Sequence, residues 1–155
     1  MSENNGQYAE VFGAFRFLIE LEGLAVAGFS EVQGLEAETE MEEIREGGVN
    51  GHVHRLPKGI KHPRIVLKRG LTSSPALWEW YDNYAQGTVP RKRKDGSIIL
   101  YKPDGEELCR WNFFGAYPVK WSGPGLNAMS SDTAIEAVEL VHNGLKMIYN
   151  RNASN

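Results

Sequence analysis

The sequence predicts a mainly β protein, a small antiparallel β-barrel or sandwich with one flanking α-helix. Three observations lead to this fold class. Several segments alternate apolar and polar residues with a period of two, which is typical of half-buried strands. Glycines and prolines separate these segments at the short intervals that antiparallel hairpins need. Only the segment between Pro75 and Gly87 repeats apolar residues convincingly at helical spacing.

Composition and charge agree with one folded domain. The chain has 155 residues, of which 41% are hydrophobic and 10% aromatic, and we expect a single domain over residues 1–155. The formal net charge of −3 gives no global basic field of the kind that favours nucleic acid. No run approaches the ~20 apolar residues of a membrane span, and the polar N-terminus lacks the features of a secretory signal. We therefore expect synthesis and assembly in the cytoplasm, without membrane insertion by this chain.

Two strands are expected in the N-terminal part of the chain. Residues 1–11 show no periodicity and are expected to form a flexible arm. Residues 12–22 alternate apolar and polar side chains, which predicts the first strand. Residues 24–32 are short and apolar, and the glycine within them predicts a bend in a second strand.

The chain is organised around the stretch from Gly28 to Arg69. From Leu35 onward, glutamates alternate with less polar residues, which predicts a half-buried strand. The glutamate face holds Glu36, Glu38, Glu40 and Glu42, and the opposite face holds Leu35, Ala37, Thr39 and Met41. The alternation loses phase near Ile44, as it would at a β-bulge or at the end of a strand. A long polar loop is expected over residues 47–62, followed by a returning strand from Ile65.

One helix is expected after the returning strand. Thr72 or Ser73 is the expected N-cap, Pro75 suits the first turn, and Gly87 suits the C-terminal end. The residues at helical spacing between them are Leu77, Trp78, Tyr81, Tyr84 and Ala85.

A meander of strands is expected in the C-terminal half. Residues 97–102 and 106–114 predict two strands joined by a tight turn at Lys102–Gly105, and Gly115 predicts a bend before the alternation resumes. Residues 133–148 fit a helical stripe and an alternating strand equally well, so periodicity leaves both open. The result is about seven strands, whose edges are satisfied either by closure of the barrel or by other copies of the chain.

No group of residues predicts a catalytic, cofactor or metal site. His52, His54 and His62 lack the cysteines or carboxylates of a metal site, so surface or interface positions are favoured for them. Cys109 has no histidine at a recognised spacing and stands at a core position of a strand. The basic cluster at 91–94 fits a solvated hairpin tip or an ion-pairing interface better than a nucleic-acid patch. We therefore expect a protein that is not an enzyme.

Several segments taken together resemble a known family. The segments are Phe15–Phe17, Gly28–Leu35, Glu42–Gly48, His54–Pro57, Leu67–Thr72, and Trp78 with Trp80–Tyr81. In this order they resemble the tail-tube proteins of contractile phages and, equally, the inner-tube proteins of contractile injection systems. The resemblance covers roughly residues 12–148, and the combination is more specific than any one segment.

The resemblance implies the tail-tube fold, a small β-barrel with one flanking helix that is related to the haemolysin-coregulated protein (Hcp) of type VI secretion. It favours a strand over residues 135–145. It also implies hexameric rings that stack into a hollow tube inside a contractile sheath. The implied partners are further copies of the chain, a sheath protein, baseplate and spike proteins, a tube-terminating cap, and an effector protein or DNA as cargo in the lumen. The chain would then be a component of a virion or of a released phage tail-like particle.

Two surfaces of such a tube are predicted. The loop over residues 47–62 is too long for a hairpin connection, and we expect it to make contacts between protomers or between successive rings. Its contact residues are expected to be Gly47, Gly48, Val49, Asn50, His54, Leu56, Pro57 and Ile60. We expect Glu36, Glu38 and Glu40 to face the lumen, because the opposite face suits the core and charges repeated around a ring are tolerable only in water.

The alternative from another class is a monomeric β-barrel that binds a small ligand or single-stranded nucleic acid. Such a module needs exposed aromatic side chains with basic residues between them. Trp111, Phe113 and Tyr117, near Arg110 and Lys120, are the candidates, although a place in the barrel core explains them better. The sequence also leaves a phage tail and an injection system open as the assembly.

Overall fold

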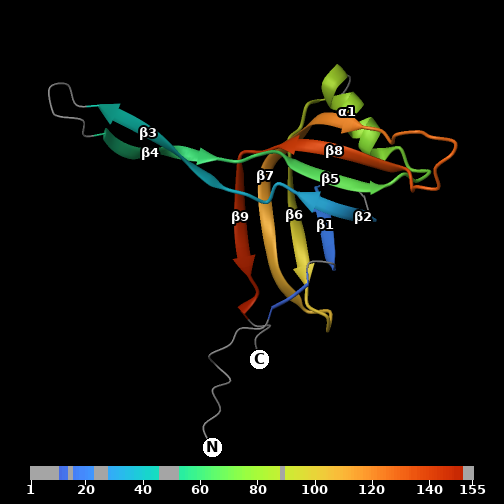
Figure 1. Ribbon diagram of the computed structural model, residues 1–155, viewed down its shortest axis with the longest axis horizontal. Helices are drawn as coiled ribbons and strands as arrows, with labels where there is room; N and C mark the ends of the chain where they lie inside the picture. Colours follow the sequence, from blue (N-terminus) through green and yellow to red (C-terminus); the bar gives the residue numbers. More distant parts are fainter. Residues whose placement is uncertain (1–10, 14–15, 23–27, 46–52, 88–89, 152–155) are drawn as a thin grey trace, which may run out of the picture.

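Nine strands and one helix form the described part of the chain, residues 11–13, 16–22, 28–45, 53–87 and 90–151 of a computed structural model (Figure 1). The strands are β1 (Phe17–Leu21), β2 (Phe29–Gln33), β3 (Glu38–Arg45), β4 (Val53–Lys61), β5 (Ile65–Gly70), β6 (Lys94–Tyr101), β7 (Glu107–Ser122), β8 (Ile135–Val141) and β9 (Gly144–Tyr149). The helix is α1 (Ala76–Gln86). The prediction of a mainly β protein with one helix is confirmed.

The main sheet has the strand order β1–β6–β7–β8–β5–β2, and β9 pairs with β7. All of these pairs are antiparallel. Its path ends at β1 on one side and β2 on the other, so the sheet is open. The closed barrel that was one expectation is therefore wrong in this detail, because a bent strand rather than closure folds the sheet over its core.

The bent strand is β7, which belongs to both halves of the sheet. Its first part, Cys109–Phe114, pairs with β9 and β6, and its second part, Tyr117–Ser122, pairs with β8. Gly115 lies between them with φ +61, and a Cβ added there would lie 2.5 Å from Nδ2 of Asn143. Glycine is therefore required at this position, as the sequence predicted for a bend.

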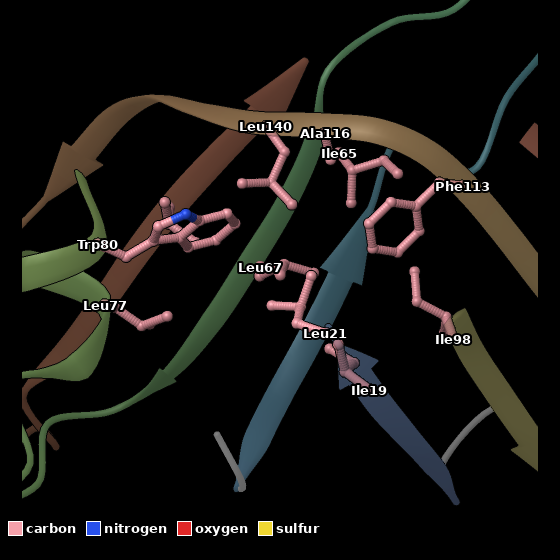
Figure 2. Close-up of a cluster of buried hydrophobic side chains, with 11 residues drawn as sticks. Ile19, Leu21, Ile65, Leu67, Leu77, Trp80, Ile98, Phe113, Ala116 and Leu140 are labelled. Atoms are coloured by element: carbon pink, nitrogen blue, oxygen red, sulfur yellow. The ribbon is translucent and has the colours of Figure 1, made fainter. Parts of the chain in front are cut away.

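The hydrophobic core lies between the two halves of the sheet and the helix (Figure 2). Side chains from β1, β5, β6, β7 and β8 converge there, and α1 adds Leu77 and Trp80. The largest fully buried apolar side chains include Phe113, Ile65, Leu67, Leu77, Ile98 and Leu140. Each such side chain contributes roughly 1.5–3 kcal/mol when it leaves water, so this cluster is the main source of stability.

The helix ends as expected but begins differently. Gly87 takes the left-handed conformation with φ +66, and its N–H donates to the carbonyl oxygen of Asn83 at 3.1 Å. Pro75 is the N-cap residue, without a side-chain cap, so the expectation of Thr72 or Ser73 at that position is wrong. The hydroxyl of Thr72 instead accepts a hydrogen bond from the N–H of Ser74 at 3.1 Å, which stabilises the turn before the helix.

The segment over residues 133–148 forms two strands, β8 and β9. The strand expectation for this region is confirmed, and the helical stripe is wrong. A short break at His142 and Asn143 separates the strands, and the N–H of Asn143 donates to the carbonyl oxygen of Phe114 at 2.8 Å. The chain does not reverse there: β9 continues β8 in the same direction along the same edge of β7, while β6 occupies the other edge.

Candidate functional site and assembly surfaces

A two-stranded hairpin of β3 and β4 projects from the body of the molecule (Figure 1). Their pairing runs from Glu38 opposite Lys61 to Arg45 opposite Val53. The expectation of a loop over residues 47–62 is therefore wrong for residues 53–61, which form a strand, while residues 46–52 lie outside the described part of the chain. The proline, glycine and lysines of this stretch are uncommon in strands, so the sequence indicated a loop. The strand tolerates them because its outer edge is unpaired in the described residues.

The two faces of the hairpin differ in chemistry. The register places Glu38, Glu40 and Glu42 on one face, as the alternation predicted. The opposite face carries an apolar cluster, because Thr39 lies opposite Ile60 and Met41 lies opposite Pro57. Lys58 is the extra residue at the register shift between Glu40 and Met41, which makes it the bulged residue of β4.

Both faces of this hairpin meet solvent. Glu36, Glu38 and Glu40 are exposed, but so are Ala37 and Met41. Only Leu35 on that side packs against the core. The argument that the glutamates must face water because their opposite face is buried therefore fails, and their position in a lumen stays a prediction.

The predicted contact residues fall on the same hairpin. Leu56, Pro57 and Ile60 are exposed on β4, with exposed fractions of 50% for Leu56 and 67% for Ile60. His54 belongs to the β4 backbone, opposite Ile44. The remaining predicted contact residues, Gly47, Gly48, Val49 and Asn50, lie outside the described residues. Large apolar side chains left in water on a projecting element are typical of an interaction surface.

A second surface is the four-stranded layer of β1, β6, the first part of β7, and β9. One face packs on the core through the row Ile19, Ile98 and Trp111, and Met147 continues this row on β9 but is 44% exposed. The other face carries a polar row across the same strands, formed by Glu20, Ser97, Asn112 and Lys146. Within the described part of the chain, β1 pairs only with β6 and β9 only with β7. Both outer edges of this layer therefore offer unpaired backbone groups to a neighbour.

Side-chain contacts organise the polar face. The Ser97 hydroxyl donates to Oδ1 of Asn112 at 2.6 Å. Nε of Arg110 donates to a carboxylate oxygen of Glu107 at 2.9 Å, and a second guanidinium nitrogen of Arg110 contacts the other oxygen. This two-point contact lowers the pKa of Glu107 against the opposing effect of burial, and it raises the pKa of Arg110. The sequence alone did not predict this face, because its polar residues are single and widely spaced.

The basic cluster at 91–94 makes contacts within the chain. Arg91 donates to the carbonyl oxygen of Tyr84 at 3.0 Å, at the end of α1. Arg93 donates to Asn143 at 3.1 Å and lies over the ring of Tyr117 at 4.7 Å from its centroid. These contacts hold Arg91 and Arg93 against the body. None of them is an ion pair, so the interpretation of the cluster as an ion-pairing surface stays a prediction.

The aromatic residues considered for a nucleic-acid module are engaged in packing. Phe113 is fully buried, and Trp111 packs against the core. The ring of Tyr117 stacks on that of Tyr84 with centroids 5.0 Å apart. None of the three rings is left as an open platform for a base.

A hollow lies between α1 and the ends of β7 and β8. Its volume is about 410 Å³, and its lining includes Leu71, Pro75, Trp78, Trp121 and Glu136. The rings of Trp78 and Trp121 meet edge to face with centroids 5.1 Å apart. The carboxylate of Glu136 is buried, with Oε2 3.7 Å from Nε of Arg69 and Oε1 3.5 Å from Nε1 of Trp121. The hollow is therefore apolar at its walls and acidic at its base.

No constellation of reactive groups accompanies these surfaces in the residues that the structure describes. Cys109 is buried, and burial together with Glu107 raises the pKa of its thiol, which disfavours the nucleophilic thiolate. A search of the same residues finds no group of three or more potential metal ligands. Their one helix is too short to cross a membrane.

Comparison with known proteins places the fold. The family model for the T4-like virus tail tube protein gp19 matches residues 13–146. A chain of the anti-feeding prophage baseplate has 23% sequence identity and a TM-score of 0.80, over 92% of this chain and 98% of that chain. A chain of the sheath–tube complex of PVC, an extracellular contractile injection system in the extended state, has 22% identity and a TM-score of 0.77, over 97% of this chain and 100% of that chain.

A third solved structure is less similar to this chain. Hcp1 from Flavobacterium johnsoniae has 22% identity and a TM-score of 0.52, over 86% of this chain and 96% of that chain. The tail-tube fold implied by the sequence resemblance is thus confirmed. No curated protein sequence matches significantly. The family model matches nearly the whole length of the chain, and the fold agrees with it. This chain belongs to the family of the T4-like virus tail tube protein gp19.

Proposed function

We propose that the chain is the structural subunit of the hollow inner tube of a contractile injection system or contractile phage tail, built from stacked hexameric rings. The observation that carries the proposal is the four-stranded layer of β1, β6, β7 and β9, which has a polar row on the face away from the core and two edges that are open among the described residues. Joining β9 of one copy to β1 of the next continues the sheet from copy to copy. Such a head-to-tail contact closes into a ring when its rotation fits.

The polar face of the layer has a natural place in such a ring. Because the other face packs on the core along β1, β6 and the first part of β7, a ring of layers presents Ser97, Asn112 and their neighbours to one side only. We assign that side to the lumen, where water replaces a packing partner. Glu36, Glu38 and Glu40, at the root and in the middle of the hairpin, remain candidates for the lumen. Their glutamate-rich face would repel anions only weakly, because salt screens the charges.

The hairpin of β3 and β4 is proposed to bridge protomers or successive rings, with Leu56, Pro57, Ile60 and His54 as described contact positions. Gly47, Gly48, Val49 and Asn50, which lie outside the described residues, belong to the same proposed contact. Partners follow from the family: the solved relatives include a sheath–tube complex, a baseplate and a tube-terminating cap. We propose sheath, baseplate, spike and cap proteins as partners of this chain, assembly in the cytoplasm, and effector protein or DNA as cargo.

The test is to isolate the native particle and locate this chain in it. Cryo-EM of particles from producing cells should place the chain in the hollow core, with the β1 and β9 edges joined between copies. Particles whose tube contains another protein, with this chain present only as a soluble monomer, would refute the proposal. The genes beside it separate the two assemblies, since capsid genes indicate a phage and their absence beside sheath and spike genes indicates an injection system.

A further inference from the structure

The projecting hairpin leaves an apolar surface without a partner in its own chain. Met41, Pro57 and Ile60 share one face, and the exposed fractions of Met41 and Ile60 are 50% and 67%. A two-stranded hairpin is marginally stable in water by itself, so this face gains most from being covered. The described body of the same protomer does not cover it, since the pairing of β3 and β4 forms a separate sheet.

The hollow beside α1 offers a surface of matching chemistry. Leu71 and Trp78 at its rim have exposed fractions of 50% and 43%, although both are large apolar side chains. With Pro75 and Trp121 they enclose about 410 Å³, which is room for side chains entering from outside. Exposed apolar patches of this kind on a soluble protein mark interaction sites.

The two surfaces lie at opposite ends of the molecule. In Figure 1 the hairpin extends along the long axis away from the body, whereas α1 and the start of β8 lie toward the other end. A protrusion at one end and a hollow at the other are complementary between copies, not within one copy. Contacts of this type are heterologous, and they repeat from copy to copy in one direction.

Charge complements the apolar match. The hairpin strand β4 carries the exposed basic residues Arg55, Lys58 and Lys61. The helix α1 contains Glu79 and Asp82 but no lysine or arginine. Asp82 lies four residues after Trp78 and so on the same side of the helix. The bulge at Lys58 turns this side chain out of the strand pairing, which frees it to meet an acidic neighbour.

We propose that the apolar face of the β3–β4 hairpin of one protomer docks into the hollow between α1 and β8 of another copy of this chain. Ile60 and Met41 would enter the hollow against Trp78 and Trp121, and Lys58 would pair with the acidic side of α1. The inference rests on the proposed tube function and adds to it the receiving site of the hairpin, which the open strand edges alone do not specify.

Photo-crosslinking in the assembled particle tests this docking. A benzoylphenylalanine in place of Ile60 should give covalent dimers and higher oligomers of the chain, and mass spectrometry should map the attachment to peptides containing Leu71–Trp78 or Trp121. The matched control carries the crosslinker in place of Leu56, which is equally part of β4 but lies on the opposite face of the hairpin, and it should not give these peptides.

Three outcomes would contradict different parts of the proposal. Crosslinks from position 60 to the sheath, or to another part of the chain, overturn the docking site while leaving the tube function intact, provided that the particles still contain this chain as their tube. Equal attachment to the hollow from positions 60 and 56 overturns the assignment of the face. Particles whose tube lacks this chain refute the proposed function itself.

Discussion

The imidazole ring of His62 lies 5.0 Å from that of His142, between ring centroids. His62 belongs to the connection from β4 to β5, and His142 to the break between β8 and β9, so the pair joins the root of the hairpin to the main sheet. Nδ1 of His142 lies 3.0 Å from the carbonyl oxygen of Gly144, which requires this nitrogen to carry the proton. Nε2 is then the basic nitrogen, and it is buried with no hydrogen-bond partner among the described residues.

Acid should destabilise the fold through His142. Burial lowers its pKa below the ordinary value of about 6.5, and the nearby His62 acts in the same direction, against the effects of the Gly144 and Pro63 backbone carbonyls. Below pH ~6.5 the unfolded chain binds a proton at this position that the folded chain does not. The free energy of unfolding therefore decreases as the pH is lowered, by at most about 1.4 kcal/mol per pH unit. Denaturation between pH 5 and 8 should show this slope. His142→Gln should flatten it, and an unchanged slope would contradict the assignment.

Phe113→Ala should cost about 3–5 kcal/mol of unfolding free energy, because Phe113 is fully buried at the centre of the core. The neighbouring Phe114→Ala is the matched control, since Phe114 is 43% exposed on the other side of the same strand. Its cost should be about 1 kcal/mol. Urea denaturation of the two variants compares them, and similar losses would mean that the core is misplaced.

Gly115→Ala should destabilise the protein by roughly 1–3 kcal/mol, because alanine is strained at positive φ and its Cβ would meet the side chain of Asn143. Gly125→Ala is the control, since an added Cβ there meets nothing within 4 Å. Thermal unfolding should separate the two variants clearly. If Gly115→Ala were as stable as Gly125→Ala, the bend of β7 would not depend on this residue.

Removing the hairpin should separate folding from assembly. Replacing residues 38–61 with a short Gly-Ser turn leaves the main sheet intact, and the ends to be joined are near each other because the ring of His62 lies 3.5 Å from the carbonyl oxygen of Glu36. We expect a folded protein by circular dichroism that builds no tubes in electron micrographs. Tubes of normal length from this variant would show that the hairpin is dispensable.

Replacing Glu38 and Glu40 with glutamine should leave folding and assembly unchanged, because both side chains are exposed and surface changes cost about 0.5 kcal/mol or less. If these residues face the lumen, the loss of charge should change how much cargo the particles carry, measured by mass spectrometry of purified particles. Asp132→Asn, an exposed position between β7 and β8, is a control for the loss of a carboxylate elsewhere. Equal cargo in wild-type and glutamine variants would remove the lumen assignment.

The sequence predicted those elements whose patterns are set by local physics. The helix between Pro75 and Gly87 was predictable because its apolar spacing and its terminal glycine agree. The turn at Lys102–Gly105 was predictable because Gly105, with φ +93, is where a tight turn needs glycine, and its N–H donates to the carbonyl oxygen of Lys102 at 2.9 Å. Within the described residues the first two strands, Phe17–Leu21 and Phe29–Gln33, are shorter than expected. The alternation of apolar and polar residues extends further along the sequence than the segments that pair with a neighbouring strand.

Features that depend on distant partners were not predictable from local pattern. The strand β4 contains a proline and a glycine and is paired only with β3, so its propensity indicated a loop. The open edge of β9 and the polar row through Ser97 and Asn112 arise from strand order, which alternation does not encode. The hollow beside α1 likewise needs Trp78 and Trp121 to meet across elements far apart in the chain.

The place of β1 in the sheet sets the order in which the chain acquires its structure during synthesis. Among the described residues, Phe17–Leu21 pairs only with residues 96–100, and every element from β2 to α1 lies between these segments in the chain. On the ribosome, β1 therefore waits without a partner while more than half of the protein is made, and closing so long a loop is slow. The pairs β6–β7 and β7–β8, by contrast, join strands that follow each other directly. The strand β6, made after α1, thus supplies the template on which β1 docks, and until then β1 exposes unpaired backbone groups that favour aggregation.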